Sequence, residues 1–377
     1  MQLRRLHKNA LYPRIHAAAR HRENTDVAEK LGIVLYTDER YAVPTFITAL
    51  SAVKNNAALE LHFYVFCVDS RNWKSQSSAL LESLGSYGNV GGVHIIDSAQ
   101  IDQRCAGVGL DSGYKGSYGA FAKLFMCDFI QADYNIVWLD SDVLVAGGLE
   151  ELCGYRFTEE KCFAACIDMN NSRGWRQKLK TDAPIVVASI FVANPVAWQA
   201  GRNSARIEQW FARFTREEIS MLMPSIVVDQ GVLTCVFGSQ WYILPAKYQV
   251  LPGYPLVGYN NFRLLFSLRK DDFYTKKDME DAVRQPVIIH FMHFIVTKPW
   301  LHDARNSFEP LWLSYYHSVP EAAGLFELRE HPPLEGFEKL KRLLFAVSPF
   351  LFCLLGRFDI SHNVKCCIKN FKTIKNW

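Results

Sequence analysis

Two aspartates, Asp140 and Asp142, directly follow the apolar run Ile136–Leu139, and a second apolar run, Val143–Val145, comes after them. On a strand side chains alternate, so residues two positions apart share a face. Two carboxylates that converge where a strand ends make a site for a hard divalent cation, and such a cation holds a diphosphate. An Asp-x-Asp in a chance surface turn does not need apolar residues on both sides. The pattern therefore indicates a metal site and favours a transferase with a nucleotide-linked donor.

Polar residues also follow the first expected strand, Gly32–Tyr36. Asp38, next to Thr37, can accept a hydrogen bond from a base N–H, and the Tyr41 ring can stack on that base. No Gly-x-Gly-x-x-Gly is present there, which argues against a dinucleotide site of the dehydrogenase kind. Taken alone, the segment fits an ordinary helix N-cap at Thr37 or Asp38 better. This segment becomes a candidate nucleotide site only when it is considered together with Asp140 and Asp142.

A histidine and a lysine in the last third of the chain could complete the metal site. His290 follows the apolar residues Val287–Ile289, and Lys298 comes shortly after it. A neutral imidazole can join two carboxylates as a metal ligand, and a lysine can neutralise charge on a departing phosphate. His293 competes with His290 for this role, and His302 is a weaker candidate.

Further candidates stand at the ends of expected elements. Asp229 and Gln230 open an apolar helix, Asp168 ends a strand, and Lys123 lies in a helix before the aspartate pair. Three of them have a plain structural alternative: an N-cap for Asp229, and solvated side chains for Gln230 and Lys123.

The elements that must position these residues alternate between strand and helix. The expected strands are Gly32–Tyr36, Leu61–Val68, Val93–Ile96, Ile136–Leu139, Phe163–Ile167, Ile185–Ala193 and Pro286–Phe291, and the expected helices are Tyr41–Lys54, Trp73–Leu84, Tyr118–Ile130, Ala205–Phe214 and Val228–Phe237. This rhythm predicts an α/β fold with a mostly parallel sheet and helices on both faces. Ligands of such sheets bind at the carboxyl ends of the strands, where Asp38, Asp140 and Asp142 stand.

Charge is distributed unevenly along the 377 residues. Residues 1–30 carry seven Lys or Arg against three Asp or Glu, and residues 338–377 carry eight against two, so a net charge of +4 leaves about −6 for residues 31–337. An acidic centre gives no reason to expect a nucleic-acid partner. Basic ends favour contact with an anionic surface, most simply a membrane leaflet.

The chain therefore divides into a basic N-terminal extension (1–30), a central domain (31–317) and a basic, helical C-terminal tail (318–377), with a Pro- and Gly-rich boundary at 318–337. Residues 337–358 mix basic and apolar side chains, as in helices that lie on membranes, although a helix packed on the domain is the alternative. No stretch reaches the roughly 18 apolar residues of a membrane span. The ten cysteines form no framework and no signal peptide is evident. We expect a cytoplasmic protein, peripheral on the inner face of the cytoplasmic membrane.

Together and in order, these segments resemble the family 8 glycosyltransferases, which include bacterial lipooligosaccharide and lipopolysaccharide galactosyl- and glucosyltransferases and glycogenin. The resemblance covers about residues 31–302. The segments that carry it are Tyr36–Tyr41, Val137–Val145 with Gly148–Leu152, Ala164–Asp168, Asp229–Gln230, and Ile288–Phe291 with Lys298–Trp300.

The resemblance implies one nucleotide-diphospho-sugar transferase domain of the GT-A type, with a mixed sheet. It implies Mn²⁺ or Mg²⁺ on Asp140, Asp142 and His290, and transfer of galactose or glucose from a UDP-sugar, with retention, to an oligosaccharide or glycolipid of the lipopolysaccharide core type. The implied donor-binding residues are Thr37, Asp38, Tyr41, Lys123, Asp140, Ser141, Asp142 and Lys298. The implied catalytic residues are Gln230, Asp229, Asp168 and Lys298. The oligomeric state is not implied.

Three departures from the family pattern concern the site. Val187-Ala188-Ser189 stands where the family has Asn-Ser/Ala-Gly, so a donor-sugar ligand is missing. Lys123 replaces an arginine and cannot make a bidentate contact. The spacing from His290 to Lys298 is longer than usual, and His293 replaces a glycine.

Two other functions remain open from the sequence. A phosphatase of the haloacid dehalogenase type also uses Asp-x-Asp, but there the pair follows the first strand of the chain. A degenerate transferase fold that binds nucleotide or glycan without turnover would explain the departures.

Overall fold

The computed structural model of the chain describes residues 28–111, 117–225, 228–292, 295–302, 305–330 and 336–357. Most of the expected N-terminal extension, His293, and the last part of the tail (358–377) lie outside these residues. Within the described ranges, no single helix combines the length and apolarity of a membrane span; only the bent pair Arg216–Met223 and Val228–Phe237 meets that criterion together.

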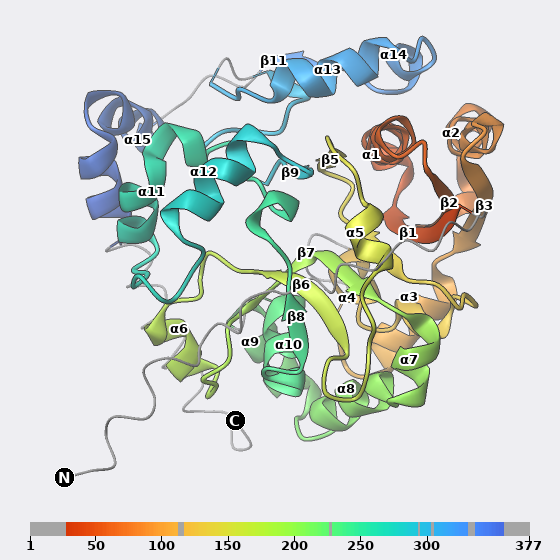
Figure 1. Cartoon of the computed structure of the whole chain (residues 1–377), viewed down its shortest axis with the longest axis horizontal. Coiled ribbons are helices and arrows are strands. Elements are labelled where there is room, and N and C mark those ends of the chain that lie inside the picture. Colours follow the sequence, from red (N-terminus) through yellow and green to blue (C-terminus); the bar gives the residue numbers. More distant parts are fainter. Residues whose placement is uncertain are drawn as a thin grey trace.

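A seven-stranded sheet forms the centre of the molecule (Figure 1). The strands in chain order are β1 (Glu29–Thr37), β2 (Leu59–Cys67), β3 (Val90–Asp97), β4 (Ile136–Leu139), β5 (Val143–Val145), β6 (Phe163–Ile167), β7 (Val186–Ala193), β8 (Trp241–Ile243), β9 (Ile288–His290), β10 (Leu301–His302) and β11 (Arg329–Glu330). The sheet order is β3-β2-β1-β4-β7-β6-β8. Neighbours are parallel except that β7 runs antiparallel to β4 and β6. The predicted α/β fold with a mixed, mostly parallel sheet is confirmed.

Helices cover both faces of this sheet. They are α1 (Ala42–Asn55), α2 (Ser75–Glu82), α3 (Ala99–Gly107), α4 (Gly119–Ala122), α5 (Glu150–Cys153), α6 (Arg173–Lys178), α7 (Pro195–Ala200), α8 (Asn203–Phe211), α9 (Arg216–Ser225), α10 (Val228–Phe237), α11 (Tyr254–Leu265), α12 (Lys276–Arg284), α13 (Glu309–His317), α14 (Ala322–Leu325) and α15 (Gly336–Val347). In Figure 1, α1 and α2 lie on one side of the sheet, and α7, α8 and α10 lie on the other. Strands β4 and β7 are consequently buried along their whole length, as expected for strands covered on both faces.

One expected helix is wrong, and the error concerns Lys123. Residues 118–130 form only the short helix α4 and one 3₁₀ turn, η4 (Met126–Asp128), instead of one amphipathic helix. Every residue from Phe121 to Cys127 is buried, so this segment has no solvent face. Lys123 therefore points into the interior rather than into water.

Two short sheets hold the site-bearing segments in place. β5 pairs antiparallel with β9, and β10 pairs in parallel with β11. Around residue 318, where the sequence places a domain boundary, the chain runs from α13 into α14 and on to β11. The tail continues as α15 and a second helical stretch, 349–357, and Figure 1 shows α15 beside α11.

Candidate active site

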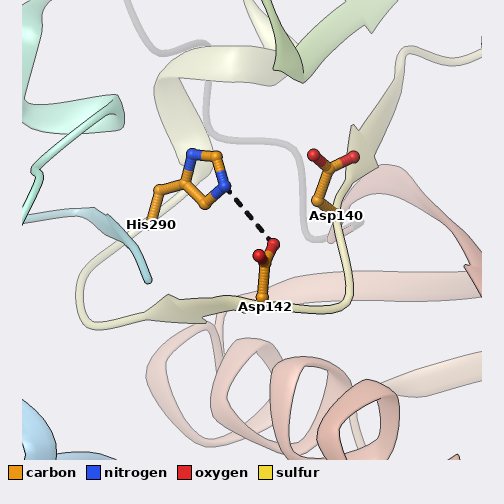
Figure 2. Close-up of side chains that lie close together, drawn as sticks. All are labelled: Asp140, Asp142 and His290. Atoms are coloured by element: carbon orange, nitrogen blue, oxygen red, sulfur yellow. Dashed lines mark ion pairs between the residues drawn. The ribbon is translucent and has the colours of Figure 1, made fainter. Parts of the chain in front are cut away.

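Asp140 and Asp142 lie in the turn between β4 and β5, and His290 is the last residue of β9. The antiparallel pairing of β5 with β9 places Val143 opposite His290, which brings the histidine beside Asp142. One ligand atom from each of the three residues lies within 4.8 Å of the others, and His290 Nε2 is 3.3 Å from Asp142 Oδ1 (Figure 2). We call these three residues the Asp-Asp-His cluster. The strand pairing thus joins ligands that are far apart in sequence.

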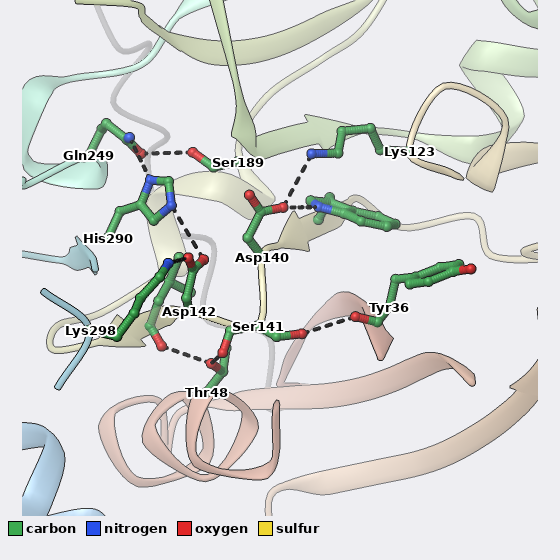
Figure 3. A network of polar contacts seen from close by, with 12 residues as sticks. Tyr36, Thr48, Lys123, Asp140, Ser141, Asp142, Ser189, Gln249, His290 and Lys298 are labelled. Carbon is green, nitrogen blue, oxygen red and sulfur yellow. Dashed lines mark hydrogen bonds and ion pairs between the residues drawn. The ribbon is translucent and has the colours of Figure 1, made fainter. Parts of the chain in front are cut away.

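Two lysines balance the charge of the Asp-Asp-His cluster (Figure 3). Lys123 Nζ lies 3.2 Å from Asp140 Oδ1 and 2.9 Å from Asp229 Oδ2, and Lys298 Nζ is ion-paired with Asp142 Oδ2. Trp138 Nε1 also donates a hydrogen bond of 2.8 Å to Asp140 Oδ1. Each aspartate therefore already has a cationic partner in the protein itself.

The protonation states of the cluster suit a metal ion. Burial lowers the pKa of His290 to about 4, so its imidazole is neutral at physiological pH. Burial is the largest single influence on Asp140 and opposes its ionisation, but the charge of Lys123 and the hydrogen bonds from Trp138 and Lys123 act together with smaller contributions to hold the pKa of Asp140 below its ordinary value. Two carboxylates and one neutral imidazole are a fitting donor set for Mn²⁺ or Mg²⁺.

Asp38, a predicted base-binding residue, is engaged locally. Its Oδ1 accepts a 3.0 Å hydrogen bond from the Tyr41 N–H and so caps the 3₁₀ turn η1 (Glu39–Tyr41), while its Oδ2 is ion-paired with Arg40 at 2.7 Å. The N-cap alternative from the sequence is therefore present. Tyr41 is 41% exposed and meets Trp300 edge-on, with ring centroids 5.9 Å apart. The loop after β1 thus lies against the segment that carries Lys298.

Ser141 and Thr37 fasten the aspartate turn to β1. Ser141 Oγ donates a 2.9 Å hydrogen bond to the Tyr36 carbonyl, and Thr45 Oγ1 lies 2.9 Å from both Ser141 Oγ and Thr37 Oγ1. Thr37 is almost fully buried. These contacts fix the direction of the turn between Asp140 and Asp142.

The buried Asp168 and the partly buried Gln230 form a second group. Gln230 Nε2 donates a 3.0 Å hydrogen bond to Asp168 Oδ2, and the backbone N–H of Asn170 donates to Asp168 Oδ1 at 2.7 Å. Burial raises the pKa of Asp168 to about 6, and the charge of Asp168 also influences His290. The Asp168–Gln230 pair and the Asp-Asp-His cluster therefore belong to one site. Asp229 belongs to the same site, because Lys123 is ion-paired with both Asp229 and Asp140.

The raised pKa of Asp168 predicts a stability change with pH. Because the folded state holds this proton more tightly than the unfolded chain, the stabilisation is present below pH 3.8 and is lost as pH rises to about 6. Asp168→Asn removes this contribution. Between about pH 4.5 and 6.5, the unfolding free energy of the variant should rise relative to wild type by about 2 kcal/mol. Urea unfolding of both proteins at the two pH values measures the difference, and parallel pH dependences would contradict the assignment.

Sequence reasoning missed two buried contacts behind His290. Gln249 Nε2 lies 2.9 Å from His290 Nδ1, and Ser189 Oγ lies 3.1 Å from Gln249 Oε1. Gln249 precedes His290 by a long stretch of chain, and no local pattern marks it. The sequence did draw attention to Ser189, because this residue lies in the segment that departs from the family pattern.

Sequence comparison with known proteins finds matches over most of this chain. The model of the family described as glycosyl transferase family 8 matches residues 32–304. A lipopolysaccharide 1,2-glucosyltransferase of Escherichia coli is 21% identical over 330 residues, which cover 85% of this chain and 87% of that protein.

Solved structures show the same fold. A galactosyltransferase, LgtC, solved in complex with donor and acceptor sugar analogues, is 20% identical with a TM-score of 0.59, covering 78% of this chain and all of that chain. The bifunctional glycosyltransferase WbbM is 18% identical with a TM-score of 0.58, over 80% of this chain and 52% of that chain. The sheet is therefore that of the GT-A fold. The phosphatase alternative is set aside, because the aspartate pair follows β4 rather than the first strand.

Proposed function

Because this chain belongs to glycosyl transferase family 8, we propose that it transfers a hexose, galactose or glucose, from a UDP-sugar to a saccharide acceptor. The main observation behind the proposal is the Asp-Asp-His cluster, together with the ion pair between Lys298 and Asp142. The similarity to the E. coli lipopolysaccharide glucosyltransferase supports an acceptor of the lipopolysaccharide core type. Retention of configuration at the anomeric carbon is part of the proposal.

In this function, separate sets of residues would bind the cation, stabilise the departing diphosphate and contact the uracil. Asp140, Asp142 and His290 would hold Mn²⁺ or Mg²⁺, and the bound cation would supply Lewis-acid stabilisation of the departing diphosphate. Lys298 would add positive charge where negative charge develops. Asp38, Tyr41 and their neighbours would contact the uracil, which requires Asp38 to exchange one of its local partners for the base.

Gln230 is the candidate group beside the anomeric carbon. Its Nε2 is committed to Asp168, which leaves the carbonyl oxygen Oε1 to face positive charge on the sugar. An amide is a weak nucleophile, and Asp229 is ion-paired with Lys123. We therefore propose that the acceptor hydroxyl attacks from the face of the leaving group, with Gln230 stabilising the oxocarbenium-like state. Trapping a glycosylated Asp168 or Asp229 would contradict this route.

Donor hydrolysis in the absence of acceptor tests the function directly. We expect Mn²⁺-dependent release of UDP from UDP-galactose or UDP-glucose, and slower release from their N-acetyl forms, because the proposed sugar is a simple hexose. The measurement is coupled detection of UDP, with excess chelator as the control. Cation-dependent binding of UDP without turnover of any donor, even with saccharide acceptors added, would instead indicate the degenerate, binding-only fold.

The C-terminal helices provide the proposed membrane contact. Gly356 packs on Leu265 of α11, yet five apolar side chains of the same helices remain exposed: Leu343, Val347, Phe350, Leu351 and Leu355. Basic residues are abundant in 338–377. An exposed apolar face among basic residues suits an anionic leaflet, with the apolar side chains at the acyl boundary. We place the protein on the inner face of the cytoplasmic membrane, near a lipid-linked acceptor.

Polar substitutions on this face should weaken membrane binding alone. Val347 and Phe350 are 72% and 52% exposed, so Val347→Ser/Phe350→Ser should leave the fold and donor hydrolysis unchanged. Binding to phosphatidylglycerol vesicles should fall by at least about tenfold, because two apolar side chains no longer enter the bilayer. Co-sedimentation measures the binding. Val196→Ser, at a 57% exposed valine of α7, is the matched control, and equal binding by both variants would refute the proposal.

A further inference from the structure

Behind His290, on the side away from Asp142, lies a buried pair of polar side chains, Gln249 and Ser189 (Figure 3). Gln249 follows the 3₁₀ turn η5 (Ala246–Tyr248), and Ser189 lies in β7. The Gln249 amide spans the gap, with Nε2 at 2.9 Å from His290 Nδ1 and Oε1 at 3.1 Å from Ser189 Oγ. Ser189 also contacts the other side of the site, because its carbonyl accepts a 3.2 Å hydrogen bond from the Asp140 N–H.

The two nitrogens of the His290 ring face different partners. Nδ1 faces the Gln249 amide, which can donate through its NH₂ group or accept through Oε1, so this contact suits either tautomer of the ring. Nε2 lies 3.3 Å from Asp142 Oδ1.

Metal binding through Nε2 requires one of these tautomers. For Nε2 to bind a cation, the proton must sit on Nδ1 and be donated to an acceptor. A half-turn of the Gln249 amide supplies this acceptor, because Oε1 then faces Nδ1 and the NH₂ group faces Ser189. The Ser189 hydroxyl suits both orientations, since it can donate to Oε1 or accept from NH₂.

We propose that Gln249 and Ser189 are positioning residues that hold His290 in the Nδ1–H tautomer, so that the lone pair of Nε2 can bind the cation. Gln249 acts on the ring directly, and Ser189 acts through Gln249. This inference rests on the metal site of the proposed function and extends it to two residues outside the Asp-Asp-His cluster.

Cation binding and the tautomer itself test the proposal without any transfer reaction. Titrating Mn²⁺ into the full chain with UDP should give roughly 10- to 100-fold weaker affinity for Gln249→Leu and for Ser189→Ala. Ser189→Thr keeps the hydroxyl and should bind close to wild type. Ser204→Ala removes another buried hydroxyl, bonded to Trp198 outside the site, and should have no effect.

Nitrogen NMR of ¹⁵N-histidine-labelled protein reads the tautomer, with the His290 signals assigned by their loss in His290→Gln. Wild type should carry the proton on Nδ1 after addition of Mg²⁺ and UDP. A proton on Nε2 under these conditions, or wild-type affinity in both Gln249→Leu and Ser189→Ala, would overturn this inference and leave the proposed function standing. Failure of wild type to bind either cation with UDP would overturn both.

Discussion

Replacing both aspartates, as Asp140→Ala/Asp142→Ala, should abolish the effect of Mn²⁺ on UDP binding and slow donor hydrolysis by at least about a thousandfold. The reason is that the two carboxylates are the only anionic members of the Asp-Asp-His cluster. Lys123 and Lys298 remain in the variant, so UDP should still bind weakly through its phosphates. The expected signature is therefore loss of the dependence on the cation rather than loss of all UDP affinity. Calorimetric titration of UDP with and without Mn²⁺ separates the two.

The variant should still fold, because Lys123 keeps a partner. Lys123 is buried and lies 2.9 Å from Asp229 as well as near Asp140, so removing Asp140 does not leave a buried ammonium unpaired. Asp281→Ala, at an exposed aspartate of α12, is the control. Unaltered cation-dependent UDP binding by the double variant would remove the basis of the proposed function.

The aspartate site could be predicted because its determinants are local. An apolar strand, a turn and a second apolar strand follow one another within Ile136–Val145, and this pattern alone places both carboxylates at the end of β4. The addition of His290 depends instead on the pairing of β5 with β9, more than a hundred residues apart. No spacing rule predicts that pairing. From the residues alone His290 was one of three candidate histidines, and the resemblance to a known family implied that it is the metal ligand.

Burial explains what sequence reasoning missed. The periodicity of residues 118–130 predicted one amphipathic helix, in which Lys123 was either a site residue or a solvated lysine. Residues 121–127 are instead all buried, and the lysine joins Asp140 to Asp229. The replacement of the family's glycine by Ser189 was visible in the sequence. Its consequence was not, because the hydroxyl reaches Gln249 only through the packing of β7 against the chain that follows η5.

Lys298→Met should change two measurable quantities in opposite directions. Lys298 Nζ is ion-paired with Asp142 Oδ2, so a cation that binds without nucleotide must compete with this ammonium. Without the lysine, Mn²⁺ affinity in the absence of UDP should increase by about tenfold, or about 1.4 kcal/mol, which is in the range of a partly buried ion pair. With a UDP-sugar the lysine is expected to move to the phosphate, so the same substitution should lower kcat/KM for donor hydrolysis about 10²- to 10³-fold.

The opposite signs distinguish this role from a structural one. If Lys298 merely supported the fold around Asp142, its loss would weaken Mn²⁺ binding and hydrolysis together. Lys298→Arg keeps the charge and should keep the weak affinity for Mn²⁺ alone, whereas Lys247→Met removes a lysine that is paired with Glu151 outside the site and should alter neither quantity. Mn²⁺ titration followed by electron paramagnetic resonance gives the first quantity, and initial rates of UDP release give the second. If Mn²⁺ affinity and the rate of donor hydrolysis both fell, the Lys298 ammonium would not be occupying the cation site before the donor binds.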